Sequence, residues 1–186
     1  QDADVRRETL TWLATLQDVK VLEDLLGLDR FSVSQGRLSG AIVSSPLGRA
    51  LRNQIELFGL RLNQAQLFRV TSNTEASIAT DNTIDQLTST LEAINTDVGS
   101  LKMPRWTADV SLTSDGADLR LAANLGQDRA ARMAATLRVA EQTQLQIQSL
   151  DVQLEPGEPG IALAQPATMV LDEGFTLDAF TMVRND

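Results

Sequence analysis

The 186-residue chain contains no cysteine, no histidine and no tyrosine. Their absence excludes Ser–His–Asp and Cys–His catalysis, disulfide bonds and zinc sites built from Cys or His. Aromatic residues make up only 4% of the chain, so large rings cannot fill a wide core. An enzyme made from this sequence would have to work with carboxylates, hydroxyl groups, lysine or arginine.

Positive charge is also scarce, with 16 basic against 25 acidic side chains and a formal net charge of -9. Nucleic-acid binding depends on neutralising phosphates with Lys and Arg, and an anionic membrane surface attracts polybasic segments. Neither kind of basic cluster is present, so we expect no nucleic-acid partner. No apolar run approaches the ~20 residues that a membrane-spanning helix needs.

The acidic residues do not form a recognisable site. Asp115 with Asp118, and Asp172 with Glu173, could be read as calcium ligands or as paired catalytic carboxylates. No D-x-[DN]-x-[DN]-G loop occurs, and turn or solvent-facing roles explain these residues better. We therefore expect no catalytic residues, no metal and no cofactor. A carboxylate enzyme acting on sugars is a minor alternative, which would need two carboxylates in one cleft.

A helical spacing occurs near the amino terminus. Asp4 can cap the start of such a helix and Gly27 can end it. The spacing predicts a helix over residues 4–27, within a helical lead-in of residues 1–30. The apolar stripe of this helix would consist of Trp12, Leu16, Val19, Leu22 and Leu26.

From residue 31 to 186 the pattern favours antiparallel strands. Short alternations of apolar and polar residues are separated by turn residues, and Asp115-Gly116 and Glu173-Gly174 predict hairpins. Residues 45–100 are ambiguous, because Leu47, Leu51 and Ile55 also match a helical stripe. Threonines and the local alternation favour strands there. The sequence thus predicts a mainly β protein with one amino-terminal helix.

The apolar faces of these strands are unusual because leucine and small aliphatic residues dominate them. One interpretation is a β-sandwich packed with leucine. The other is an antiparallel sheet curled on itself, an open β-groove whose apolar concave face holds a flexible apolar ligand. In the second case we expect the groove to be lined by Val110, Leu112, Leu119, Leu121, Leu137, Val139, Leu145, Ile147, Met169, Leu171 and Leu177.

The carboxy-terminal part carries a recognisable succession of strands and turns. Leu145–Leu154 precedes a Pro/Gly break, and Leu163-Ala-Gln-Pro-Ala167 opens the next strand. The acidic turn Glu173-Gly174 then leads into a strand that ends at Leu177. In these features the chain resembles the translocation and assembly module (TamB) family of the AsmA-like group, best over residues 100–186 and partly over 30–100.

That resemblance implies a β-taco, an open curled sheet forming an interior segment of a longer protein. Such proteins are anchored in the inner membrane of diderm bacteria and cross the periplasm. It further implies lipid transport in the cell envelope, with phospholipid acyl chains passing along the groove towards the outer membrane. An outer-membrane barrel of the TamA kind would bind through parts of the protein that are absent here. The family has also been linked to outer membrane biogenesis and protein secretion.

A second hypothesis is a scaffold or chaperone module that aids outer-membrane protein assembly. Such a module would bind extended segments by adding them as strands to an open sheet edge. The candidate edge is Leu145–Leu154, which is rich in glutamine and low in charge. An exposed edge would also allow the chain to pair edge to edge with a second copy.

Overall fold

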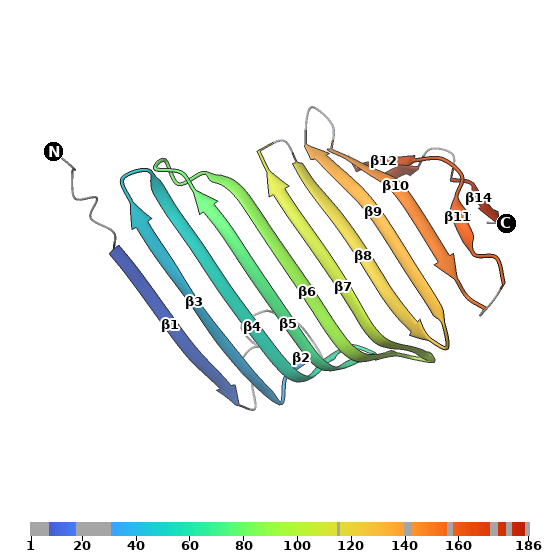
Figure 1. Ribbon diagram of the computed structural model, residues 1–186, viewed down its shortest axis with the longest axis horizontal. Helices are drawn as coiled ribbons and strands as arrows, with labels where there is room; N and C mark the ends of the chain where they lie inside the picture. Colours follow the sequence, from blue (N-terminus) through green and yellow to red (C-terminus); the bar gives the residue numbers. More distant parts are fainter. Residues whose placement is uncertain are drawn as a thin grey trace.

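The structure is a computed structural model that describes residues 8–17, 31–114, 116–139, 143–155, 158–171, 175–177 and 180–184. In these ranges the chain is all-β and forms one open antiparallel sheet of fourteen strands (Figure 1). No helix occurs in the described part, and so none there is long and apolar enough to cross a membrane. The expectation of a mainly β, antiparallel fold is confirmed.

The sheet is a meander in which most strands pair with their neighbours in the chain. Its order is β1-β3-β4-β5-β6-β7-β8-β9-β10-β11-β14, with β12 paired to β10 and β13, and β2 paired to β4. The strands are β1 (Glu8–Gln17), β2 (Phe31–Ser32), β3 (Gln35–Ser45), β4 (Gly48–Leu62), β5 (Ala65–Ile78), β6 (Ile84–Val98), β7 (Leu101–Thr113), β8 (Gly116–Gly126), β9 (Arg129–Val139), β10 (Thr143–Gln153), β11 (Ile161–Leu163), β12 (Ala167–Leu171), β13 (Phe175–Leu177) and β14 (Met182–Arg184).

The helix expected over residues 4–27 is wrong where the structure describes it. Residues 8–17 form β1, which pairs with β3 in unbroken register from Glu8↔Ser44 to Gln17↔Gln35. Trp12 and Leu16, four residues apart, share a face in a strand as well as in a helix, so their spacing could not decide between the two. The β-branched residues Thr9, Thr11 and Thr15 favour the strand. Residues 4–7 and 18–27 lie outside the described residues.

The structure also describes residues 45–100 and one of the two predicted hairpins. Residues 45–100, whose pattern favoured strands over helices, contain all of β4, β5 and β6. The hairpin expected at Asp115-Gly116 is confirmed by the pair Thr113↔Gly116, although Asp115 itself lies outside the described residues. The turn at Glu173-Gly174 also lies outside them, between the paired residues Leu171 and Phe175.

Short polar turns join the strands. Asn63, Gln127 and Asp128 have positive φ angles of 53°, 53° and 58°, as tight hairpin turns require. Between β5 and β6, a carboxylate oxygen of Asp81 accepts hydrogen bonds from the hydroxyl of Thr83 at 2.6 Å and from its backbone N–H at 2.9 Å. The hydroxyl contact, followed by the backbone contact, lowers the pKa of Asp81. Both bonds hold the turn in one conformation.

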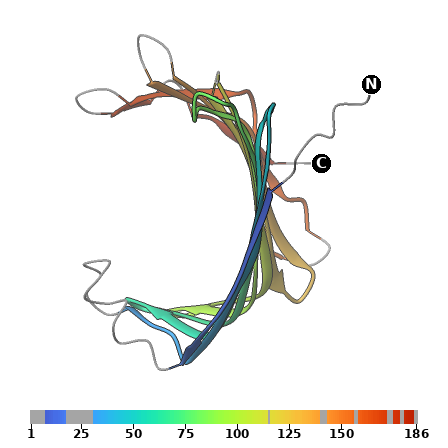
Figure 2. The ribbon, with the colours of Figure 1, turned by 90° about the vertical axis from the view of Figure 1, so that its left-hand side faces the viewer.

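The sheet is strongly curved along its strands, and viewed down its long axis it has a C-shaped profile (Figure 2). Part of this curvature comes from a crease that crosses β4–β7 at Gly59, Phe68, Asn95 and Pro104. Residues on both sides of these positions pair in register, as at Leu60↔Leu67 and Arg69↔Ile94. Gly59 and Asn95 have positive φ angles of 62° and 51°. This backbone geometry bends strands and suits glycine and asparagine.

A cluster of buried residues lies inside this crease. Leu67, Val70 and Ala93 form a cluster against which Leu57, Leu60 and Trp106 pack. Ala93 is 0% exposed, and the Trp106 Nε1–H donates a 2.9 Å hydrogen bond across the crease to the Thr96 hydroxyl, which is 2% exposed. Phe68, by contrast, is 63% exposed. The cluster therefore marks the inner side of the bend, and hence the concave face of the sheet.

Candidate functional site

Strand register extends the concave face from the crease across the whole sheet. Directly paired residues point to the same side, and so do residues two apart within a strand. Starting from Val70 and Ala93, four rows of paired residues begin at β1; the first two reach β12 and the other two end at β10. The rows are Leu10-Ile42-Leu51-Ala76-Leu87-Leu112-Ala117-Leu137-Leu145-Met169; Trp12-Gly40-Asn53-Thr74-Ser89-Val110-Leu119-Ala135-Ile147-Ala167; Ala14-Leu38-Ile55-Ser72-Leu91-Ala108-Leu121-Met133-Leu150; and Leu16-Gly36-Leu57-Val70-Ala93-Trp106-Ala123-Ala131-Val152.

These four rows contain no charged residue, whereas the convex face carries many. On the convex side, ion pairs link neighbouring strands at Arg52–Glu75 (3.3 Å), Arg69–Glu56 (2.7 Å) and Arg105–Glu92 (2.6 Å). Exposed pairs of this kind contribute at most about 1 kcal/mol each. Their placement matters more than their energy, because it leaves the concave face almost purely apolar.

The eleven residues expected to line a groove occupy matching positions in this register. Val110 pairs with Leu119, Leu137 with Leu145, and Leu145 with Met169. Leu112, Leu121 and Ile147 belong to the same rows, and Val139 continues the β9 alternation beyond Leu137 at the rim, where it is 63% exposed. Leu171 and Leu177 occupy corresponding backbone positions, Leu177 opposite Met169. That these residues line a path for a ligand stays a prediction.

The first half of the sheet contributes concave residues that were not among these candidates. Trp12 is an example, since its ring covers Gly40 of β3. A Cβ at Gly40 would collide with that ring and lie 2.5 Å from the Arg52 carbonyl oxygen, so only glycine allows this contact. The signal for this half was the alternation through Leu38, Gly40 and Ile42, which continues in Leu51, Asn53, Ile55 and Leu57.

Polar residues on the concave face were also missed. Asn53, Ser72, Thr74 and Ser89 are the four polar members of the rows, and they are half-buried neighbours on β4, β5 and β6. The Thr74 and Ser89 hydroxyls form a 2.9 Å hydrogen bond with each other. We call these four residues the polar island.

One proposed sheet edge is corrected by the structure. β10, which contains most of Leu145–Leu154, pairs with β9 on one side. On its other side it pairs with β12 at residues 144–147 and with β11 at residues 151–152. It is therefore an interior strand. In the described part of the sheet, the long edge strand is β1, which pairs only with β3.

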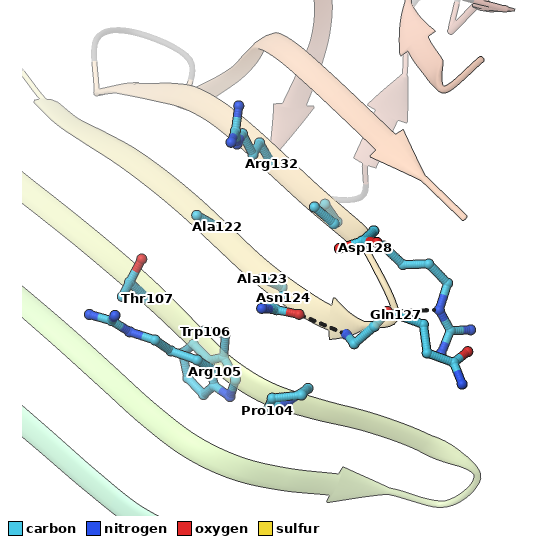
Figure 3. Close-up of a pocket in the computed structure, with 14 residues that line it drawn as sticks. Pro104, Arg105, Trp106, Thr107, Ala122, Ala123, Asn124, Gln127, Asp128 and Arg132 are labelled. Carbon is cyan, nitrogen blue, oxygen red and sulfur yellow. Dashed lines mark hydrogen bonds between the residues drawn. The ribbon is translucent and has the colours of Figure 1, made fainter. Parts of the chain in front are cut away.

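A shallow depression of about 660 Å³ lies beside the Gln127-Asp128 turn, and residues of both faces line it, Trp106, Ala123 and Ala131 of the fourth row among them (Figure 3). Arg105, Asn124 and Arg132 are among its lining residues. Asn124 accepts a 2.7 Å hydrogen bond from the Gly126 N–H, and Arg105 is held by Glu92. These contacts stabilise the β8–β9 hairpin and the sheet surface, and the depression contains none of the groove candidates.

Within the described ranges, no group of three or more Asp or Glu side chains is placed to hold a metal ion. The concave face is therefore the candidate functional surface on this part of the molecule. No family model matches the chain, and neither a curated protein nor a solved structure matches it.

Proposed function

We propose that the concave face carries phospholipid acyl chains, and that the chain is a TamB-like β-taco segment without enzymatic activity. The observation that supports this proposal is the uninterrupted uncharged face from β1 to β10, continued by two rows onto β12, on a single-layer sheet. Within the described residues no second layer packs on it, as a sandwich would require. Covering apolar surface is favourable by roughly 25 cal/mol per Å², so an apolar occupant would be stabilised on this face.

The shape of the sheet favours a long, flexible occupant. The strands curve along their length, and the rows run across them, from one end of the sheet to the other (Figures 1 and 2). An acyl chain lying along a row would meet Leu, Val, Ile, Met and Ala side chains from successive strands. Hydrocarbon requires no hydrogen-bonding partner, so it can slide without breaking directional contacts.

The wider setting belongs to the same proposal. By its likeness to the TamB family, the segment would work in the periplasm as part of an inner-membrane-anchored protein. It would pass phospholipid towards the outer membrane. A barrel of the TamA kind would be engaged by other parts of that protein.

Site-specific photo-crosslinking tests lipid occupancy directly. We expect a photoreactive residue at Leu119 or Leu137 to form adducts with phospholipid in cells. The same residue at Arg120 or Arg138, one position along on the convex face, should form few or none. Adducts of equal yield on both faces would contradict the proposal, because they would indicate non-specific lipid contact.

A second candidate function is strand addition at the β1 edge, and the free side of β1 favours it. β1 is 10 residues long and contains one charged residue, Glu8. Leu10 and Leu13 are 65% and 63% exposed. Natural sheets usually protect such an edge with lysine, proline or a bulge. An extended segment with alternating apolar residues, such as an outer-membrane protein strand, could pair with it.

Replacing Leu13 with lysine should block that edge. We expect binding of an extended outer-membrane-protein peptide, followed by fluorescence anisotropy, to weaken at least tenfold in Leu13→Lys. The matched control is Leu47→Lys, which alters a leucine that is 92% exposed in the β3–β4 turn and should leave binding unchanged. Sedimentation of the same variants reports whether a second copy of the chain competes for this edge. Unchanged peptide binding in Leu13→Lys would exclude β1 as the docking edge.

A further inference from the structure

The polar island interrupts the apolar rows at one place only. Asn53 pairs with Thr74, Thr74 pairs with Ser89, and Ser72 precedes Thr74 by two residues on the same face. Apolar residues flank the island on both sides, with Leu51, Ala76 and Leu87 in one adjacent row. Continuing past Ser89, the row becomes Val110, Leu119 and Ala135, which are entirely apolar.

The island has hydrogen-bonding capacity that the protein itself does not use. In the Thr74–Ser89 pair one hydroxyl donates to the other. The accepting hydroxyl therefore keeps its own hydrogen to donate. In the described part of the chain, the Asn53 amide and the Ser72 hydroxyl have no hydrogen-bond or ion-pair partner. Strand register places all four residues on the concave face, and all four are half-buried. Their donors are therefore only partly accessible to solvent.

The chemistry of these groups selects a neutral acceptor. Hydroxyl and amide N–H groups donate well to carbonyl oxygens. An anionic phosphate would require a cation to offset its desolvation, and the four rows contain none. Pure hydrocarbon would leave the donors unsatisfied, which costs free energy in an apolar setting.

We propose that the polar island binds the ester carbonyls of the glycerol region of a phospholipid. This inference rests on the proposed lipid-carrying function and assigns a fixed position to one part of the lipid. The acyl chains then lie on the apolar rows, while the ester groups contact β4–β6. The island makes the first half of the sheet selective for ester-linked lipids, and β7–β12 accept any long hydrocarbon.

Comparing lipids with and without the ester carbonyl tests the proposal. The probes are dipalmitoyl phosphatidylglycerol and its dialkyl ether analogue, which has the same headgroup and chain length. We expect the wild-type chain to bind the diester form on the order of five- to tenfold more tightly, as one or two hydrogen bonds predict. The variant Asn53→Leu/Ser72→Ala/Thr74→Val/Ser89→Ala, which removes all four donors of the island, should bind both lipids with equal affinity.

The chain offers a matched control on the opposite face. Thr88 and Ser111 form another directly paired Thr–Ser couple, on β6 and β7, and register places them on the convex side. Thr88→Val/Ser111→Ala should keep the full preference for the diester. Equal binding of both lipids by the wild type, or a preference that survives in Asn53→Leu/Ser72→Ala/Thr74→Val/Ser89→Ala, would overturn the island assignment. Failure to bind either lipid would instead overturn the lipid-carrying function.

Discussion

The variant Leu121→Asp will remain folded but lose phospholipid binding. Leu121 lies in the middle of the concave face, between Ala108 on β7 and Met133 on β9. A carboxylate there puts an ion against hydrocarbon wherever an acyl chain follows that row, which is strongly unfavourable. It also removes part of the apolar burial of Leu121, which is half-buried; a fully buried leucine contributes about 1.5–3 kcal/mol. Binding of a fluorescent phospholipid, together with circular dichroism, measures the two effects separately.

The expected folding of this variant distinguishes an open face from a closed core. An open concave face can hydrate the carboxylate, so strand pairing should persist. If Leu121 were enclosed in a sandwich core, the same substitution would lower the free energy of unfolding by several kcal/mol and unfold the protein. The matched control is Ala122→Asp, one residue along β8 on the convex face, where the side chain is exposed. If Leu121→Asp folds and binds lipid as well as the control does, Leu121 does not line the lipid path.

A second large effect is expected at Trp106. Its ring packs against the crease cluster, and its Nε1–H satisfies the buried Thr96 hydroxyl. Trp106 is partly buried, so Trp106→Ala should cost about 3 kcal/mol of stability, the lower end of the range for large core side chains. Trp106→Phe keeps most of the packing but leaves the Thr96 hydroxyl without its donor, a loss of about 1–3 kcal/mol. Urea unfolding measures the loss, and hydrogen exchange should locate it in β5–β7.

The chain's other tryptophan provides the comparison. Trp12 is half-buried on the edge strand β1 and covers Gly40. Trp12→Ala should cost about 1 kcal/mol, which is typical of sites outside a core. Equal losses at Trp12 and Trp106 would show that the crease is not the most stable part of the sheet.

The sequence was most informative where alternation and turn residues agreed. In β8, the run Leu119, Leu121, Ala123 alternates with polar or small residues and follows Gly116, so strand, face and hairpin could all be predicted. At Trp12 and Leu16 the spacing of four residues suits both helix and strand, and the pairing with β3 decided between them. Tertiary pairing of this kind leaves no local signal.

The candidate surface was predictable in part for a related reason. Alternation within a strand fixes which residues share a face, but it does not say how two strands align. Leu145 could therefore be placed on one side of its own strand. Its position opposite Leu137 on one side and Met169 on the other emerges only from the register. The polar island escaped prediction because Asn53, Thr74 and Ser89 lie far apart in the sequence and look like ordinary solvent-facing residues.

The meander order of the sheet has a consequence for how such a molecule can change in length. Each of the long strands from β4 to β9 pairs with the strands next to it in the chain. The stability of the sheet is then close to a sum of terms for individual hairpins and for the contacts between adjacent hairpins, as in repeat proteins. Adding one two-strand unit would extend the sheet and deleting one would shorten it. In both cases the remaining residues would keep their concave or convex side. The length of the sheet can thus vary by whole hairpins without the formation of a new hydrophobic core.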